Sequence, residues 1–205
     1  LTGKGMEEKK SKDLRDLAHQ ELERAITQMA FGFEGRRAEP FHAQVLMSLP
    51  RRVTSSDTPS LGISLRVNGI YLLVNPGYFT GTLTTTGLRA AAIRHEEMHL
   101  FLMHPFRQLE MDPSGRELYP DRRLFQIAAD IEANQYISGH EELPGCVTMD
   151  TFPDLGLSPA ESLQSIYGKL GTLLDQLENP EAGKTAPLAS PLSAAALARL
   201  LDSSW

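Results

Sequence analysis

The five-residue run His95-Glu96-Glu97-Met98-His99 constrains this chain more than any other feature, and it lies in a stretch with helical character. Residues four apart on an α-helix differ in direction by roughly 40°, so the imidazoles of His95 and His99 can reach one ion. Glu96 projects to the edge of the same site, where it can take a proton from a metal-bound water. The run therefore predicts two neutral nitrogen ligands and a general base, which form the core of a zinc-dependent hydrolase.

The alternative is a surface helix whose histidines are merely solvated, because a bare match to this pattern also arises by chance. Residues 88–103 favour a buried helix, since they contain little Gly or Pro and carry apolar residues at helical spacing: Leu88, Ala91, Ala92, Met98, Phe101 and Leu102. Burying histidines and acids there costs free energy unless they are paired or bind a metal. Glu97 stands where such motifs usually carry an uncharged residue, so it either points to solvent or is a second acid at the site.

Composition excludes several classes of protein. A chain of 205 residues can bury the core of one domain and carry a tail. Its net charge of −6 argues against a nucleic-acid partner, which usually selects a basic face. The single cysteine, Cys146, excludes an internal disulfide and a cysteine-rich metal site, and it suits a reducing cytoplasm. No apolar run approaches the ~20 residues of a membrane span and no signal-peptide core is visible, so we expect a cytoplasmic protein without a membrane partner.

Hydrophobic periodicity predicts an α+β chain with a small sheet. Residues 61–74 alternate in hydrophobicity around Asn68-Gly69, which predicts a β-hairpin with a two-residue turn. Pro105 should end the motif helix near His104, and Asp121 can cap the next helix. The expected helices cover residues 6–30, 41–49, 88–104, 122–137, 160–177 and 192–201.

A catalytic zinc usually has three protein ligands and one open position, so a third ligand is needed. His104 is unsuited because it would lie roughly 180° around a continuing helix from His95; we expect it to meet the helix C-terminal dipole instead. Asp130, on the next predicted helix and flanked by small and apolar residues, is the preferred candidate, with Glu132 as the alternative. Asn134, one turn further on, would hold the carboxylate or a zinc histidine in place.

Two families share this arrangement of motifs. Residues 95–105 and 124–134 resemble a bacterial metallopeptidase-domain family that is often encoded beside MoxR-type AAA ATPases and VWA-domain proteins. There an H-E-x-x-H helix precedes a helix that reads roughly N-I-A-A-D-x-x-x-N, and this chain has Gln126 in place of the first Asn. The resemblance covers about half the chain or more, from the hairpin at residue 61 to Tyr167. More distantly, Asp130 to Asn134 is similar to the acid-x-x-Ala-Asn segment of ImmA/IrrE-type metallopeptidases.

The resemblance implies a zincin-like (minigluzincin-like) fold with a long N-terminal helix, in which the motif helix packs against a second ligand-bearing helix. It implies one zinc ion held by His95, His99 and Asp130, with Glu96 as the general base. The metallopeptidase domain would span residues 1–178. Residues 179–205 would form a Pro/Ala/Ser-rich linker or tail, leading in longer relatives to a VWA-like domain that is not visible here.

Three functions compete at this point. The first is zinc-dependent endopeptidase activity on a protein or peptide, which could bind as an added strand along the hairpin edge. The second is a zinc-bound interaction module that works with a MoxR-type AAA ATPase or VWA-domain partner and cleaves little. The third is a helical regulator with a vestigial site. No oxyanion stabiliser stands out, and four residues qualify by chain position alone: Tyr136, His140, Tyr119 and Arg107.

Overall fold

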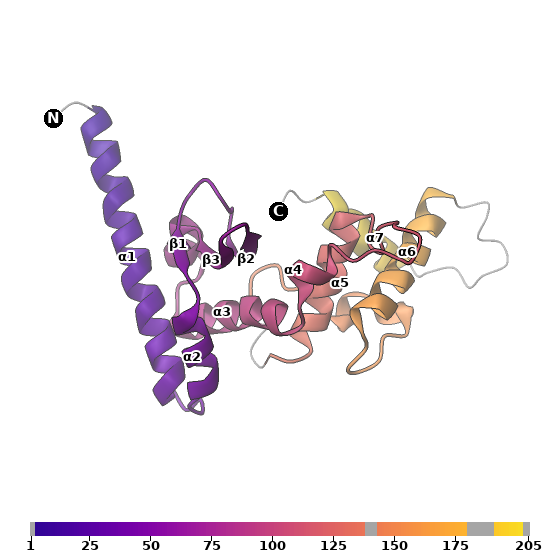
Figure 1. Cartoon of the computed structure of the whole chain (residues 1–205), viewed down its shortest axis with the longest axis horizontal. Coiled ribbons are helices and arrows are strands. Elements are labelled where there is room, and N and C mark those ends of the chain that lie inside the picture. Colours follow the sequence, from indigo (N-terminus) through magenta and orange to yellow (C-terminus); the bar gives the residue numbers. More distant parts are fainter. Residues whose placement is uncertain (1–2, 138–142, 180–190, 203–205) are drawn as a thin grey trace. The chain divides into compact units, whose positions relative to one another are not determined.

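The computed structural model describes residues 3–137, 143–179 and 191–202 of this mostly helical α+β protein (Figure 1). The described residues divide into two compact units. Unit 1 contains residues 3–101 and 143–144, and unit 2 contains residues 102–137, 145–179 and 191–202. The mixed α+β prediction is thereby confirmed. In the described part of the chain, no helix combines the length and the hydrophobicity that a membrane crossing requires.

Unit 1 begins with two helices that match the predicted ranges. The first, α1 (Gly3–Phe31), is long, and its N-terminal half extends beyond the rest of the unit (Figure 1). Its C-terminal half is packed, with one buried stripe at helical spacing: Ala18, Leu22, Ala25, Ile26 and Met29. The second, α2 (Pro40–Ser48), starts with a proline at its first position and contacts both α1 and the motif helix.

The sheet of unit 1 has three strands in the order β1-β3-β2. The predicted hairpin is present, with β2 (Leu61–Arg66) antiparallel to β3 (Gly69–Val74). Its turn residues are Val67 and Asn68, one position earlier than expected, because Gly69 adopts φ +130° as the first residue of β3. The third strand, β1 (Arg51–Val53), pairs in parallel with β3. It was not predicted, since three residues with two arginines carry no strand signal.

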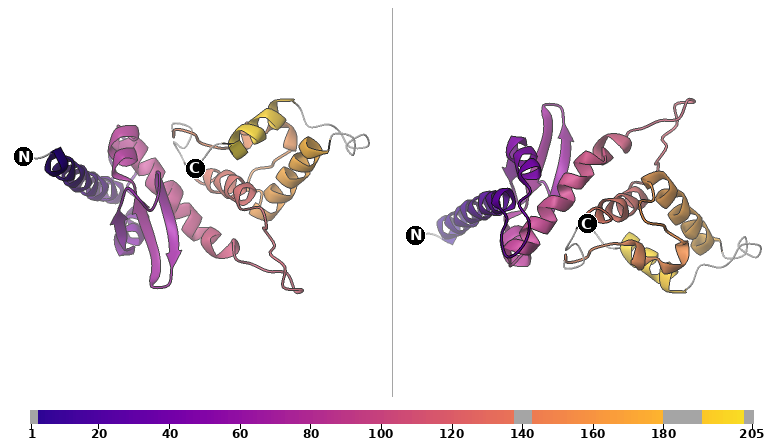
Figure 2. Two further views of the ribbon diagram at one scale, coloured as in Figure 1. Left: turned by 90° about the horizontal axis from the view of Figure 1, so that it is seen from above. Right: turned by 90° about the horizontal axis from the view of Figure 1, so that it is seen from below.

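The motif helix α3 (Thr86–Phe101) follows a short π-helix, η1 (Tyr78–Thr82). The Asn75 carboxamide oxygen starts η1 by accepting from the N–H groups of Gly77 and Tyr78. Thr85 precedes α3, and its Oγ1 accepts from the Leu88 N–H in the first turn of the helix. The helix packs against β2 and α1 (Figure 2), and its buried side joins the core of unit 1. This core contains Leu22, Ala25, Ile26, Met29, Ala43, Leu46, Leu61, Leu72, Val74, Phe79, Leu83, Ala90, Ala92 and Ile93.

The end of α3 differs from the prediction. Helix α3 stops at Phe101, Met103 takes a left-handed conformation with φ +61°, and His104 begins the short helix α4 (His104–Arg107). His104 is 2% exposed. The expectation that His104 meets the C-terminal dipole of the motif helix was wrong, because the left-handed turn starts a new helix and His104 joins the interior of unit 2.

Unit 2 is a helical assembly around α5 (Arg122–Asn134). The Asp121 carboxylate caps α5 as predicted, accepting from the N–H groups of Arg123 and Leu124. Helix α6 (Leu163–Glu178) is capped by Ser162, so it starts a few residues later than expected. Helix α7 (Pro191–Asp202) confirms the short helix predicted at residues 192–201, and it belongs to the packed unit, since Leu197 and Leu200 are buried in its core.

The remaining core of unit 2 comes mainly from α5 and α6 and contains Tyr119, Leu124, Phe125, Ile127, Ala128, Ala129, Ile131, Val147, Phe152, Leu163, Ile166, Leu170 and Leu173. Residues 191–202 of the predicted linker or tail are thus a docked helix. Residues 180–190, between α6 and α7, lie outside the described ranges.

The cap of α5 gives a direct test of this unit. Replacing Asp121 with Ala should lower the free energy of unfolding by about 1 kcal/mol, because two helix N–H groups lose their acceptor. Asp121→Asn should preserve stability, since Asn caps equally well. Urea unfolding followed by circular dichroism measures both variants, and equal losses in the two would argue against the cap.

Candidate metal centre

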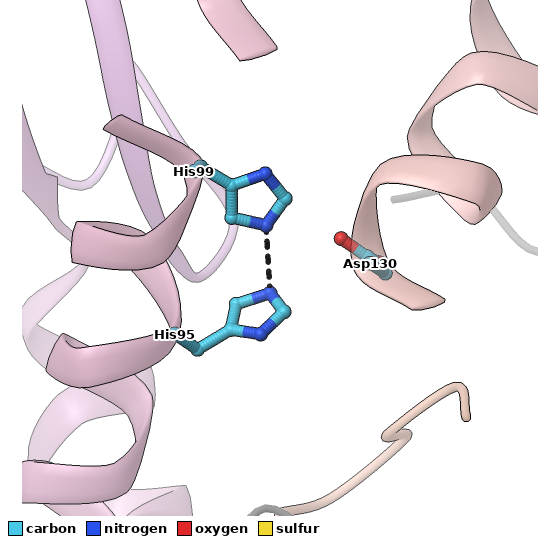
Figure 3. A group of neighbouring side chains, drawn as sticks. All are labelled: His95, His99 and Asp130. Atoms are coloured by element: carbon cyan, nitrogen blue, oxygen red, sulfur yellow. Dashed lines mark hydrogen bonds between the residues drawn. The ribbon is translucent and has the colours of Figure 1, made fainter. Parts of the chain in front are cut away.

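The two histidines of the motif face each other from one side of α3. Their Nε2 atoms lie 2.9 Å apart, and the rings meet edge to face with centroids 4.6 Å apart (Figure 3). Two nitrogens that share a tetrahedral zinc would lie about 3.3 Å apart, given Zn–N bonds of about 2.05 Å. The helix therefore presents both imidazoles at a separation close to that which a single small cation requires.

Asp130 belongs to the same group of ligand atoms. One atom from each of His95, His99 and Asp130 lies within 4.8 Å of the others, and Figure 3 shows the carboxylate on the side where the ring nitrogens meet. All three side chains are partly exposed. Two imidazoles and one carboxylate form a possible metal-binding triad with the donor chemistry of catalytic zinc.

Glu96 is held by the sheet. Its Oε2 accepts a hydrogen bond of 3.0 Å from the backbone N–H of Ile63 in β2. Tyr78, at the start of η1, also lies within electrostatic reach: burial raises the pKa of its phenol, and the negative charge of Glu96 raises that pKa further. The predicted base thus has a backbone partner and a phenol near it, both from unit 1.

Glu97 points away from solvent into a charged cluster. It is 0% exposed, and it accepts from Arg94 Nη1 at 2.7 Å and pairs with His42 Nδ1 at 3.1 Å. Burial is the main influence and raises the pKa of Glu97, while Arg94 and His42 offset part of the rise. Glu97 is therefore neither a solvated acid nor a second acid at the histidines, as the sequence had suggested. Its carboxylate instead connects α3 to α2 through Arg94 and His42.

Glu132 is committed to a different cluster, inside unit 2. Its Oε2 pairs with His104 Nε2 at 2.7 Å and with Arg107 at 3.3 Å, and its Oε1 accepts from the Leu163 N–H at 2.8 Å. Burial raises the pKa of Glu132, but the His104 and Leu163 hydrogen bonds outweigh it, so the pKa lies below its ordinary value. Both Glu132 oxygens have partners inside unit 2, and the group of ligand atoms that contains His95 and His99 includes Asp130 and not Glu132.

Asn134 and three of the four oxyanion candidates lie in the described part of the chain. Asn134 Nδ2 donates to the Val147 carbonyl at 2.8 Å, which ties α5 to the chain after it. Tyr119 is buried against Phe125 and Tyr167, and Tyr136 is 47% exposed. Arg107 is paired with Glu132 as described above, and His140 lies outside the described residues.

Sequence reasoning missed the groups that surround Glu96 and Glu97. The Ile63 donor is a backbone atom, which leaves no trace in residue identity. His42 is 55 residues from Glu97, so only tertiary packing brings them together. The one usable signal was the Asn75-Pro76-Gly77 turn, which fixes where Tyr78 enters its helix.

Comparisons with family models, with curated proteins and with solved structures found no match. The metallopeptidase family inferred from the motifs stays a prediction.

Replacing Glu132 with Gln should destabilise unit 2 by about 3 kcal/mol near neutral pH, because the buried His104 imidazole and the partly buried Arg107 guanidinium lose the carboxylate that pairs with them. The lowered pKa means that the ionised form stabilises the fold. This contribution is complete above the unfolded value near 4.5 and is lost as the pH falls through the lower folded value. The deficit of Glu132→Gln should therefore shrink in acid.

Urea unfolding at several pH values measures this deficit. Glu117→Gln is the matched control, because its pair with Arg122 is about half exposed and should contribute less than about 1 kcal/mol. Equal effects of the two substitutions would contradict the buried cluster.

Proposed function

We propose that this protein is a zinc-dependent peptidase. The observation that carries the proposal is the pair of imidazoles on α3 facing each other, with the Asp130 carboxylate in the same group of ligand atoms. His95, His99 and Asp130 would hold one Zn²⁺ and leave a fourth position open. The resemblance of the motifs to zincin-like bacterial metallopeptidases supports the same assignment of ligands.

The proposed mechanism assigns one chemical role to Glu96. Zinc, when bound, supplies acidity to a water molecule and polarises the scissile carbonyl. Glu96 takes the proton from the attacking water and returns it to the leaving amine. The Ile63 N–H restrains the carboxylate through Oε2, which leaves Oε1 for proton transfer.

We propose a protein or peptide substrate that is cleaved internally. Strand β2 lies at an edge of the sheet, and an extended peptide can add to such an edge by main-chain hydrogen bonds. We place the activity in a reducing cytoplasm, in keeping with the single cysteine, and the resemblance adds a MoxR-type AAA ATPase or VWA-domain protein as the proposed partner.

A second candidate is a zinc-bound interaction module with little activity. It is favoured by two of the oxyanion candidates, because Arg107 is paired with Glu132 and Tyr119 is buried in the core of unit 2. A wild-type protein that binds zinc and cleaves no peptide in an unbiased library would support this candidate over the peptidase.

Metal binding separates the two candidate third ligands. Wild-type protein should bind one zinc ion, and Asp130→Asn should weaken binding by more than about 100-fold, since even outer partners of ligands contribute 10- to 100-fold. Glu132→Gln, two residues away on α5, should retain zinc in the folded fraction despite its lower stability. Competition titration with a chromophoric chelator measures both, and the reverse pattern would transfer the ligand role to Glu132.

Glu96→Gln should abolish peptide cleavage, with a loss of at least about 10²-fold, while zinc stoichiometry stays unchanged. Mass spectrometry of a digested peptide mixture measures cleavage, and elemental analysis measures zinc. Glu110→Gln, an exposed position outside the motif helix, is the control and should cleave normally. Cleavage retained by Glu96→Gln would refute the base mechanism.

A further inference from the structure

The Ile63 N–H that binds Glu96 lies outside the hydrogen-bond ladder of the sheet. Ile63 is opposite Leu72, whose own N–H points to β1 and donates to the Pro50 carbonyl at 2.9 Å. In an antiparallel pair, the two facing residues either both bond to each other or both point away. Since Leu72 points away from β2, the Ile63 N–H points to the open edge, where Glu96 meets it.

We propose that this backbone N–H is a positioning group for Glu96, so that the edge of β2 is a working part of the peptidase site; the proposal rests on the function proposed above. The contact joins residues 33 apart in sequence, and it anchors one defined carboxylate oxygen. A free glutamate side chain samples several rotamers, and this bond selects one of them. Because the acceptor is charged, the bond is of the stronger class.

Tyr78 supports the assignment from a second direction. Tyr78 and Ile63 both pack against the core of unit 1, and the negative charge of Glu96 contributes to the raised pKa of the Tyr78 phenol. Glu96 thus contacts the edge of β2 and lies within electrostatic reach of the start of η1. Asn75 fixes the start of η1, because its side chain accepts from the Tyr78 N–H and donates to the Thr58 carbonyl in the loop before β2. The Ile63 N–H and the Tyr78 phenol both belong to unit 1, the unit that also carries Glu96.

Hydrogen exchange tests the contact without any requirement for activity. In the wild-type chain, the Ile63 amide should exchange about 10- to 100-fold more slowly than the Leu65 amide. Leu65 has the same open-edge orientation, and among the described residues no bond to a side chain is recorded for its N–H. Glu96→Ala should remove the protection of Ile63, whereas Glu96→Gln should keep part of it, because the amide oxygen still accepts. Equal exchange of Ile63 and Leu65 in wild-type protein would overturn the proposal.

A proline scan of the same edge tests the consequence for catalysis. Proline is tolerated where an edge-strand N–H points away from the ladder, so Ile63→Pro removes the donor and leaves the β2–β3 pairs in place. We expect kcat to fall about 100-fold with little change in KM and in zinc affinity, since misplacement of a catalytic group by about 1 Å has a cost of that size. Leu65→Pro is the matched control and should keep kcat within about twofold.

The two measurements separate the possible failures. Suppose that the wild-type protein is inactive but its Ile63 amide is protected, and that Glu96→Ala removes this protection. That result would refute the peptidase proposal and support the positioning contact. If the wild-type protein is active and Ile63→Pro leaves kcat unchanged, the peptidase proposal stands and the proposed catalytic role of the Ile63 contact is refuted. If Ile63→Pro fails to fold, the exchange comparison still decides whether Glu96 is held.

Discussion

The structure of unit 1 depends on helix α3, which makes a different set of contacts on each of three sides. One side carries apolar residues such as Ile93 into the core, a second carries Arg94 and Glu97 to α2, and a third presents His95 and His99. The helical period of 3.6 residues separates these sides, so each can be satisfied without disturbing the others. The imidazoles are thus presented by a helix that is fixed on its other two sides, which gives a metal site a rigid support.

Each unit contains a buried acid that is paired with basic side chains. Glu97 and Glu132 are both almost fully buried, and each is surrounded by a histidine and an arginine from its own unit. A buried carboxylate without such partners would lose its charge or destabilise the fold. Asp130 and Glu96 are partly exposed, and these are the two acids to which the proposed peptidase mechanism gives a ligand role and a base role.

Local patterns in the sequence predicted much of the architecture. The ranges of α1, α2 and α7, the Asp121 cap and the hairpin follow from periodicity and turn chemistry, which act over a few residues. The histidine pair followed from its spacing on one helix, and Asp130 was the preferred third ligand because small and apolar residues flank it. What failed depended on tertiary contacts or on single backbone angles: the left-handed Met103 that redirects His104, the short strand β1, and the burial of Glu97. The Ile63 donor could not be predicted, because it requires knowing which edge of the hairpin is free.

The uneven packing of α1 has a consequence for its dynamics. Only the C-terminal half of α1 contacts the core, so the N-terminal half depends on intrinsic helix propensity and on pairs between neighbouring charged side chains. Isolated helical segments of this length are marginal in water. The first turns of α1 should therefore melt and reform independently of the rest of unit 1. A protease would cut there before it cut the packed half of α1, and the truncated chain would still contain the motif helix and its sheet.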